Sequence, residues 1–173
     1  LIHFSSTSVY GTQDEKVDEN CSKNNLKPQS PYAETKLKEE EWLKKQEFEN
    51  RLKFVTLRLG TIAGVSTGMR FHTAVNKFSW QASMGLPITV WKTALNQKRP
   101  YLDILDAMKV IKLVIDKNIY DGSIYNVVTE NMTVNDIVQI IQMRIKDLEI
   151  EFVDSKIMNQ LSYEVLSNKI VNT

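Results

Sequence analysis

The sequence predicts an α/β fold in which strands alternate with helices around a parallel sheet. Short apolar segments alternate along the chain with longer segments in which apolar residues follow helical spacing. Strands that are separated by helices imply parallel crossover units. The composition supports a packed core, because 42% of the 173 residues are hydrophobic and 25% are charged.

Two strands and two helices are expected in the first half of the chain. The apolar segment at 1–6 runs into hydroxyl residues and a glycine turn, which indicates a buried strand that ends at a polar rim. A helix is expected over 31–50, because Pro31 is tolerated in a first helical turn and the Lys- and Glu-rich run after it supplies ion pairs one turn apart. A second strand is expected over 53–59 and a second helix over 71–84.

The second half of the chain is expected to continue this alternation. Apolar residues at helical spacing predict a helix over 103–117. Glycines at 60, 64 and 68 do not form the G-x-G-x-x-G pattern of a phosphate-binding turn, so this stretch is interpreted as a loop. The remaining elements, in chain order, are strands over 88–91, 123–128 and 149–153 and helices over 133–147 and after Asp154.

A tyrosine and a lysine lie close together at the start of the 31–50 helix. Their spacing places Tyr32 and Lys36 on one helix face, one turn apart. A neighbouring cation favours the phenolate and lowers the pKa of a tyrosine from its usual value of about 10, so Tyr32 is a candidate proton shuttle. Taken alone, the same pair equally describes an ordinary surface helix, so the surrounding motifs decide between the two interpretations.

Hydroxyl residues follow the first predicted strand. In open α/β sheets, ligands bind beyond the carboxyl ends of the strands, so the side chains of 5–8 lie where a substrate is expected. Ser6 could contact such a substrate or could merely cap the strand end. Position and chemistry therefore agree on a polar site at this strand end.

These features belong to a longer series of motifs. The motifs are SSTSVYG at 5–11, PYAETK at 31–36, FVTLRLGTIAG at 54–64, KRPYLDILDA at 98–107, and the pair GSIYNVV at 122–128 and MTVNDI at 132–137. In this order they resemble the extended short-chain dehydrogenase/reductase superfamily, and within it the nucleotide-sugar epimerase-like, NAD-dependent epimerase/dehydratase family.

The resemblance implies a particular arrangement of the α/β fold. It implies the C-terminal part of a Rossmann-type parallel sheet with helices, plus a small α/β substrate-binding lobe. Residues 1–68 are expected in the dinucleotide-binding domain and 69–173 mainly in the lobe, with about 97–118 packing back on the Rossmann part. The motif pair at 122–137 is expected to form a strand and helix of the lobe.

The resemblance also assigns roles to individual residues. Tyr32 is expected to transfer a proton to or from a sugar hydroxyl, Lys36 to hydrogen-bond the nicotinamide ribose, and Ser6 to orient the same hydroxyl. Arg99 is expected to bind the sugar-nucleotide pyrophosphate, although it could instead pair with an acidic neighbour. The expected catalytic residues are Ser6, Tyr32 and Lys36, the cofactor-binding residues are Tyr32, Lys36, Leu59 and Gly60, and the substrate-binding residues are Ser6, Thr7, Thr61 and Arg99.

Two features distinguish this chain from complete members of the family. No glycine-rich phosphate loop precedes Leu1, so the chain is expected to be a fragment that lacks most of the cofactor site and is inactive alone. Thr7 and Ser8 stand where the family's 4,6-dehydratases carry an acidic pair, which disfavours dehydration.

The resemblance predicts a nucleotide-sugar epimerase that uses NAD, with NADP as the alternative cofactor. Two other functions stay open: a nucleotide-sugar 4-ketoreductase of the same family, and a non-catalytic regulator that senses the dinucleotide on the same scaffold. The intact set of Ser6, Tyr32 and Lys36 favours an enzyme, since a sensor does not need a proton-transfer group.

Composition points to a small-molecule partner. A net charge of +1 gives no electrostatic reason to bind nucleic acid or an anionic membrane, and no apolar run is long enough to cross a bilayer. The single cysteine, Cys21, cannot form an internal disulfide, which fits a cytoplasmic location. His3 and His72 lack clustered ligand partners, so no metal site is expected.

The resemblance further implies a homodimer that is formed through the 31–50 helix. Leu37, Trp42, Leu43 and Phe48 supply apolar surface on this helix, but its charged run equally describes a solvated face.

Overall fold

The computed structural model describes residues 1–49, 52–154 and 161–173. Its strands are β1 (Ile2–Ser6), β2 (Val55–Leu59), β3 (Thr61–Ala63), β4 (Ile88–Trp91), β5 (Lys98–Asp103), β6 (Ile124–Val127), β7 (Glu130–Thr133) and β8 (Ile150–Val153). Its α-helices are α1 (Pro31–Phe48), α2 (Ala74–Ser83), α3 (Ile104–Asp116), α4 (Val134–Arg144) and α5 (Asn168–Val171). Short 3₁₀ helices are η1 (Thr7–Tyr10), η2 (Lys23–Asn25) and η3 (Lys92–Ala94).

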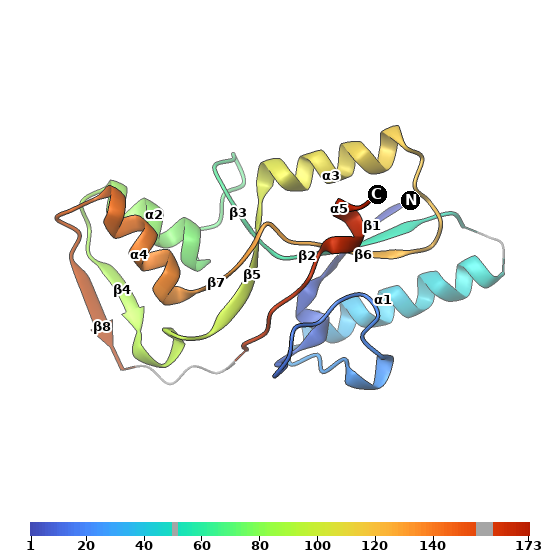
Figure 1. The fold of residues 1–173 in the computed structure, drawn as a ribbon, viewed down its shortest axis with the longest axis horizontal. Coiled ribbons are helices and arrows are strands. Elements are labelled where there is room, and N and C mark those ends of the chain that lie inside the picture. Colours follow the sequence, from blue (N-terminus) through green and yellow to red (C-terminus); the bar gives the residue numbers. More distant parts are fainter. Residues whose placement is uncertain (50–51, 155–160) are drawn as a thin grey trace.

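Strands β1, β2 and β6 form a parallel sheet between α1 and α3. β2 is the central strand and pairs with both β1 and β6. α1 lies on one side of this sheet and α3 on the other (Figure 1). Val55 and Leu57 of β2 belong to one core cluster with Val114 of α3, whereas Arg58 contacts Glu40 of α1. Both faces of β2 are buried, with Val55 and Leu57 on one face and Thr56 and Arg58 on the other.

Local side-chain chemistry fixes where the main helices begin. Ser30 precedes α1 and accepts a hydrogen bond from the backbone N–H of Ala33, while Pro31 occupies the first turn. α4 starts with a capping box, in which the Thr133 and Asp136 side chains each accept a hydrogen bond from the other residue's backbone N–H. The Ser30 cap fixes where α1 begins, and therefore where its first two turns, with Tyr32 and Lys36, lie on the sheet.

A smaller part of the molecule contains the other strands together with α2 and α4. β3 pairs with β5 in parallel and β5 pairs with β7 antiparallel, while β4 and β8 form a separate parallel pair. Figure 1 shows β5 and β7 running from this part toward the first sheet. The core of the smaller part is an apolar cluster of Phe78, Ala82, Ile88, Val90, Tyr101, Ile137 and Val138.

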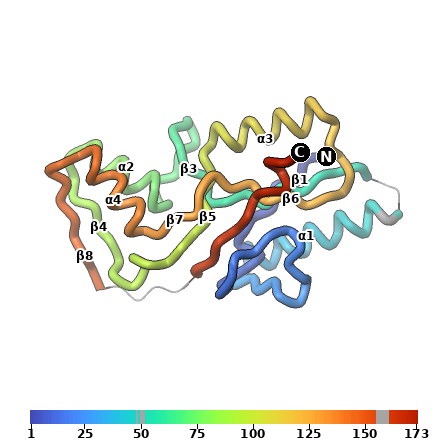
Figure 2. Tube along the Cα trace, in the orientation of Figure 1, coloured from blue at the N-terminus to red at the C-terminus, as the bar shows by residue number. Residues whose placement is uncertain are grey.

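The C-terminal segment returns from the smaller part to the first sheet (Figure 2). Val165 forms a bridge with Val17, and the Asn131 side chain makes hydrogen bonds to both backbone polar groups of Val165. α5 follows, and its Ile170 joins the core between α3 and the sheet. The segment over 161–171 therefore belongs to the same packed unit as β1 and β6.

The α/β class and the alternation of strands and helices that the sequence predicts are confirmed. Helix ends differ most at 71–84, where α2 begins only at Ala74, and at 133–147, where α4 ends at Arg144. The expected end of the first helix, at residue 50, lies outside the described residues.

Three strands do not follow from the sequence pattern. The interpretation of the glycine-punctuated stretch as a loop is wrong for β3, which pairs with β5. β5 begins with Lys98, Arg99 and Pro100, and β7 begins with Glu130 and Asn131, so neither has the apolar pattern of a buried strand. These segments are strands because pairing with distant parts of the chain supplies their hydrogen bonds.

Two C-terminal elements also differ from expectation. The strand expected at 123–128 is present as β6, but it pairs with β2 in the first sheet, whereas the resemblance assigns it to the smaller lobe. Of the helix expected after Asp154, residues 155–160 lie outside the described residues and 161–167 is not helical. The division of the chain at residue 68 stays a prediction.

Candidate functional site

A cavity of about 800 Å³ lies at the carboxyl ends of β1 and β2. This is the edge at which ligands bind in open α/β sheets. Its walls come from β1, η1, α1, the β2–β3 junction, β5 and the segment before α2, with further residues from the starts of α2 and α3 and from the C-terminal segment, where Tyr163 lies. All eight residues that the sequence analysis assigns to the site line this cavity: Ser6, Thr7, Tyr32, Lys36, Leu59, Gly60, Thr61 and Arg99. Their individual roles stay predictions.

Ser6 ends β1 and caps η1. Its Oγ accepts hydrogen bonds from the Ser8 backbone N–H at 3.2 Å and from the Ser8 hydroxyl at 2.9 Å. The capping role is therefore real, but both contacts use Ser6 as the acceptor. The hydroxyl hydrogen of Ser6 has no acceptor among the described residues, so it is available to a ligand in the cavity.

Thr7 has a different environment, although it also lines the cavity. Its Oγ1 donates to the Leu59 carbonyl at 3.3 Å and lies 3.1 Å from the Tyr163 hydroxyl, and the residue is only 2% exposed. Burial raises the pKa of Tyr163 above its ordinary value. The Thr7 hydroxyl thus joins η1, β2 and the C-terminal segment, a role that sequence reasoning does not anticipate.

Tyr32 and Lys36 lie on adjacent turns of α1. The Tyr32 side chain is 58% exposed, and the Lys36 Nζ lies 6.0 Å from the centroid of its ring. Lys36 also contacts Glu39, with 2.8 Å between Nζ and Oε2. The same carboxylate oxygen lies 2.9 Å from His3 Nε2. Hydrogen bonds from His3 and Lys36 hold the pKa of Glu39 below its ordinary value.

Glu39 is a site residue that sequence reasoning misses. The only sequence signal is its position three residues after Lys36, which is the spacing of a helical ion pair. Any ligand that needs the Lys36 ammonium has to compete with this carboxylate. His3 is largely enclosed and contributes to the same contact.

At the junction between β2 and β3 the wall of the cavity is formed by backbone, which packs closely against β5. The Gly60 N–H donates to the Val127 carbonyl at 3.0 Å. A Cβ at Gly60 would lie 3.1 Å from the Pro100 carbonyl oxygen, so a larger residue here would press on β5. Thr61 follows directly and lines both this cavity and a second one beside it.

Arg99 also lies between the two cavities. The second cavity has a volume of about 300 Å³, and Lys77 and the half-exposed Trp91 are on its wall. Desolvation lowers the pKa of Arg99 from its ordinary value. No carboxylate in 1–49, 52–154 or 161–173 forms an ion pair with Arg99, so the alternative of an acidic neighbour has no support there. Neither cavity has an Asp or Glu among its described lining residues.

This charge pattern suits an anionic ligand. A guanidinium binds phosphate oxygens through paired donors, and a partly desolvated guanidinium without a carboxylate partner gains most from such a ligand. The structure thus brings a phenol, an ammonium and a guanidinium, from Tyr32, Lys36 and Arg99, to one cavity.

Tyr10 supports the site from behind, at the end of η1. It is fully buried, and its hydroxyl lies 2.9 Å from Asn126 Oδ1 and 3.0 Å from the Asp18 carbonyl oxygen. Burial raises the pKa of Tyr10 to about 12.

The raised pKa of Tyr10 predicts a loss of stability at alkaline pH. Below about pH 10 the phenol is neutral in both the folded and the unfolded chain, so its contribution is fully present. Between about pH 10 and pH 12 only the unfolded chain loses the proton, so the free energy of unfolding falls by about 3 kcal/mol. Urea unfolding of the wild type and of Tyr10→Phe, from pH 8 to pH 11.5, is expected to show a steeper decline for the wild type. Parallel declines would contradict the assignment to Tyr10.

Two other kinds of site are absent from the described residues. No helix in 1–49, 52–154 or 161–173 has the length and apolar character needed to span a bilayer. In the same ranges, no three His, Cys, Asp or Glu side chains are grouped so that they could hold a metal ion.

Comparison with known families and sequences identifies clear relatives. A family model described as "NAD dependent epimerase/dehydratase family" matches residues 1–127. A protein of Bacillus subtilis (strain 168), described as the uncharacterized UDP-glucose epimerase YtcB, is 31% identical over 129 residues. That match covers 73% of this chain and 38% of the relative.

Solved structures share the fold. UDP-glucose 4-epimerase of Thermus thermophilus in complex with NAD has a TM-score of 0.81 at 22% identity, covering 99% of this chain and 57% of that protein. UDP-glucuronic acid 4-epimerase of Bacillus cereus, in complex with UDP-glucuronic acid and NAD, has a TM-score of 0.81 at 24% identity. This match covers 99% of this chain and 54% of that protein. The chain thus spans about half the length of these enzymes.

Proposed function

Because the chain belongs to the NAD dependent epimerase/dehydratase family, we propose that the protein that carries it epimerises nucleotide sugars. One observation carries the proposal: a single cavity gathers a hydroxyl, a phenol, an ammonium and a guanidinium, from Ser6, Tyr32, Lys36 and Arg99. The similar Bacillus subtilis protein, described as a UDP-glucose epimerase, supports this class of substrate.

Tyr32 exchanges a proton with the sugar hydroxyl that reacts. Its half-exposed side chain is accessible to a ligand in the cavity. Ser6 donates its unused hydroxyl hydrogen to the same sugar oxygen and holds it near Tyr32. Lys36 places a positive charge one helical turn away, where it stabilises the negative charge that develops on the tyrosine oxygen during proton transfer.

The residues around Lys36 fit the nicotinamide half of NAD. Lys36 and Tyr32 provide donors that suit ribose hydroxyls, and Leu59 and Gly60 provide a close backbone wall. Bound NAD supplies the oxidation and reduction of the sugar carbon. The Lys36 ammonium, which contacts Glu39, would hold a ribose hydroxyl of the cofactor in place of that contact. NADP is the alternative cofactor.

Arg99 holds the diphosphate of the substrate in this proposal. Replacing Arg99 by methionine is expected to weaken the binding of UDP by about 10- to 100-fold, because hydrogen bonds to a charged group contribute roughly 1.5–3 kcal/mol. Calorimetric titration of the protein with UDP measures the change. Arg144→Met is the matched control, since Arg144 ends α4 and lines neither cavity. Equal affinity of Arg99→Met and the wild type would place the diphosphate elsewhere.

We also propose a homodimer in which α1 contributes to the interface. Trp42 is 58% exposed and offers a large apolar side chain to a partner. Leu37 and Leu43 do not contribute in the same way, since Leu37 packs against the core cluster that contains Val9, and Leu43 is 3% exposed. Trp42→Glu is expected to shift the protein to a monomer in analytical ultracentrifugation.

The reaction is tested with the whole protein that carries this chain and with the chain alone. Each is incubated with NAD and either UDP-glucose or UDP-glucuronic acid, and products are separated by chromatography. The 4-epimer is expected from the whole protein, without net change in NADH absorbance, and no product is expected from the chain alone.

Other outcomes identify the alternative functions. Stoichiometric consumption of NADH or NADPH with a 4-keto sugar nucleotide would show a ketoreductase instead. Tight binding of NAD without turnover of any sugar nucleotide would show a non-catalytic regulator. A 4-keto-6-deoxy product would show a dehydratase, which Thr7 and Ser8 disfavour.

A further inference from the structure

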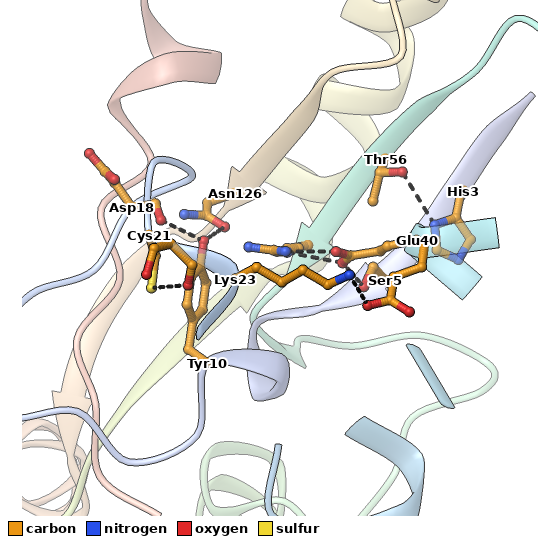
Figure 3. A network of polar contacts seen from close by, with 12 residues as sticks. His3, Ser5, Tyr10, Asp18, Cys21, Lys23, Glu40, Thr56 and Asn126 are labelled. Carbon is orange, nitrogen blue, oxygen red and sulfur yellow. Dashed lines mark hydrogen bonds and ion pairs between the residues drawn. The ribbon is translucent and has the colours of Figure 1, made fainter. Parts of the chain in front are cut away.

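A buried ion pair lies directly behind the cavity (Figure 3). Glu40 of α1 and Arg58 of β2 are 4% and 3% exposed. Arg58 Nε donates to Glu40 Oε1 at 2.9 Å, and an Arg58 Nη donates to Oε2 at 2.6 Å, so the pair is bidentate. The Ser5 hydroxyl of β1 donates to the same carboxylate at 2.5 Å. One carboxylate thus ties α1 to two strands of the sheet.

Each member of this group is next to a residue of the cavity wall. Glu40 lies one helical turn after Lys36, Ser5 immediately precedes Ser6, and Arg58 immediately precedes Leu59. A shift of the carboxylate relative to the strands would therefore move the proposed proton-transfer groups of α1 relative to Ser6.

The same network of contacts extends from Arg58 to η1, another segment of the cavity wall, and from there to β6. The Arg58 guanidinium lies 4.9 Å from the centroid of the Tyr10 ring, and Tyr10 contacts Asn126 of β6. Figure 3 shows Tyr10 next to Asn126 at one end of the network, with Glu40 farther along it. Tyr10 ends η1, so the turn that carries Thr7 is fixed to the same framework.

Stability alone does not explain such a pair. The desolvation of two buried charges offsets most of their attraction, and apolar residues of similar volume often replace a buried ion pair with no loss of stability. A bidentate pair does impose one geometry, which apolar contacts do not. Placement matters here, because a shift of about 1 Å in a catalytic group can lower turnover by roughly 100-fold.

We propose that Glu40, Arg58 and Ser5 form a positioning group that holds Tyr32 and Lys36 in register with Ser6. The proposal rests on the proposed function for its effect on turnover, but the positioning is a property of the chain itself. Glu40 and Arg58 touch no ligand in this scheme and act only through the segments they join.

The double variant Glu40→Leu, Arg58→Met separates positioning from stability. It removes both charges together, so neither is left unpaired in the core. Its melting temperature is expected to lie no more than about 4 °C below that of the wild type. In the whole protein, kcat is expected to fall by at least about tenfold while the KM for the sugar nucleotide changes by less than about threefold. The matched control Lys44→Met, Glu47→Leu removes an exposed ion pair from the same helix and is expected to keep wild-type kcat.

Hydrogen exchange gives a readout that does not depend on activity. In the double variant, backbone amides of 5–11 and 32–37 are expected to exchange faster than in the wild type, while those of α4 are unchanged. A double variant with wild-type kcat and wild-type exchange would overturn the proposal and leave the pair as a structural element only. If the double variant does not fold, Glu40→Asp provides the test, since it keeps the charge but shortens its reach; wild-type kcat in that variant would overturn the proposal.

The two proposals fail in distinguishable ways. A wild-type protein that converts no sugar nucleotide contradicts the proposed function, whereas unchanged exchange in the double variant contradicts the positioning group.

Discussion

Replacing Tyr32 by phenylalanine is expected to lower kcat of the whole protein by about 100- to 10,000-fold, the usual contribution of a positioned proton-transfer group. The ring and its place on α1 stay the same, so binding of the sugar nucleotide is expected to change little. Steady-state kinetics with the preferred sugar nucleotide measures both constants. A loss in kcat with a nearly constant KM is the pattern of an interaction that acts mainly in the transition state.

A second tyrosine provides the control for that experiment. Tyr120 lies beside Leu1, Lys53 and Asn118, in a separate small cavity away from the proposed site. Tyr120→Phe is expected to keep wild-type kcat. Near-normal turnover in Tyr32→Phe would remove the proton-transfer role from this residue, even if the protein proves to be an epimerase.

Replacing Arg58 alone by methionine is expected to lower the free energy of unfolding by about 3–5 kcal/mol. The change leaves the Glu40 carboxylate buried, with Ser5 as its remaining hydrogen-bond donor among the described residues. Urea unfolding followed by circular dichroism measures the loss. Arg144→Met, at an exposed arginine, is expected to cost less than about 1 kcal/mol.

The single and double substitutions are informative together. A loss below about 1 kcal/mol in Arg58→Met would mean that the Glu40 carboxylate is hydrated in the variant and is not left as an unpaired buried charge. A large loss that is restored by adding Glu40→Leu would show instead that the cost comes from the unpaired charge.

The sequence predicts the parts of the fold in which local preference and tertiary contacts agree. Pro31 and the ion-pair spacing after it locate α1, and the short β-rich segment over 53–59 locates β2. β3, β5 and β7 are different, because their polar or glycine-flanked sequences become strands only through pairing with one another. Such pairing depends on residues far away in the chain and leaves no local pattern.

In the candidate site, too, some residues can be predicted from local motifs and others only from tertiary contacts. Residues that belong to recognisable motifs, such as Tyr32 and Arg99, line the cavity as expected. The acidic residues that contact Lys36 and Arg58 do not stand out in the sequence. Glu39 and Glu40 occur in a run of three glutamates, where composition suggests only a solvated face, yet one binds Lys36 and the other is buried against Arg58. Which of the two glutamates is buried depends on how α1 is rotated about its axis where it packs on the sheet.

The contact between Thr7 and Tyr163 has a consequence for how the protein acquires its binding site during folding. The two residues are separated by 156 positions, although their hydroxyl oxygens are 3.1 Å apart. Contacts between such distant residues form only after the entropy of closing a long loop has been lost, so they tend to form late. α1 and its cap are local and can form early. Partly folded chains can therefore have much of their secondary structure while this wall of the cavity is still open, and ligand binding reports the completion of folding rather than its onset.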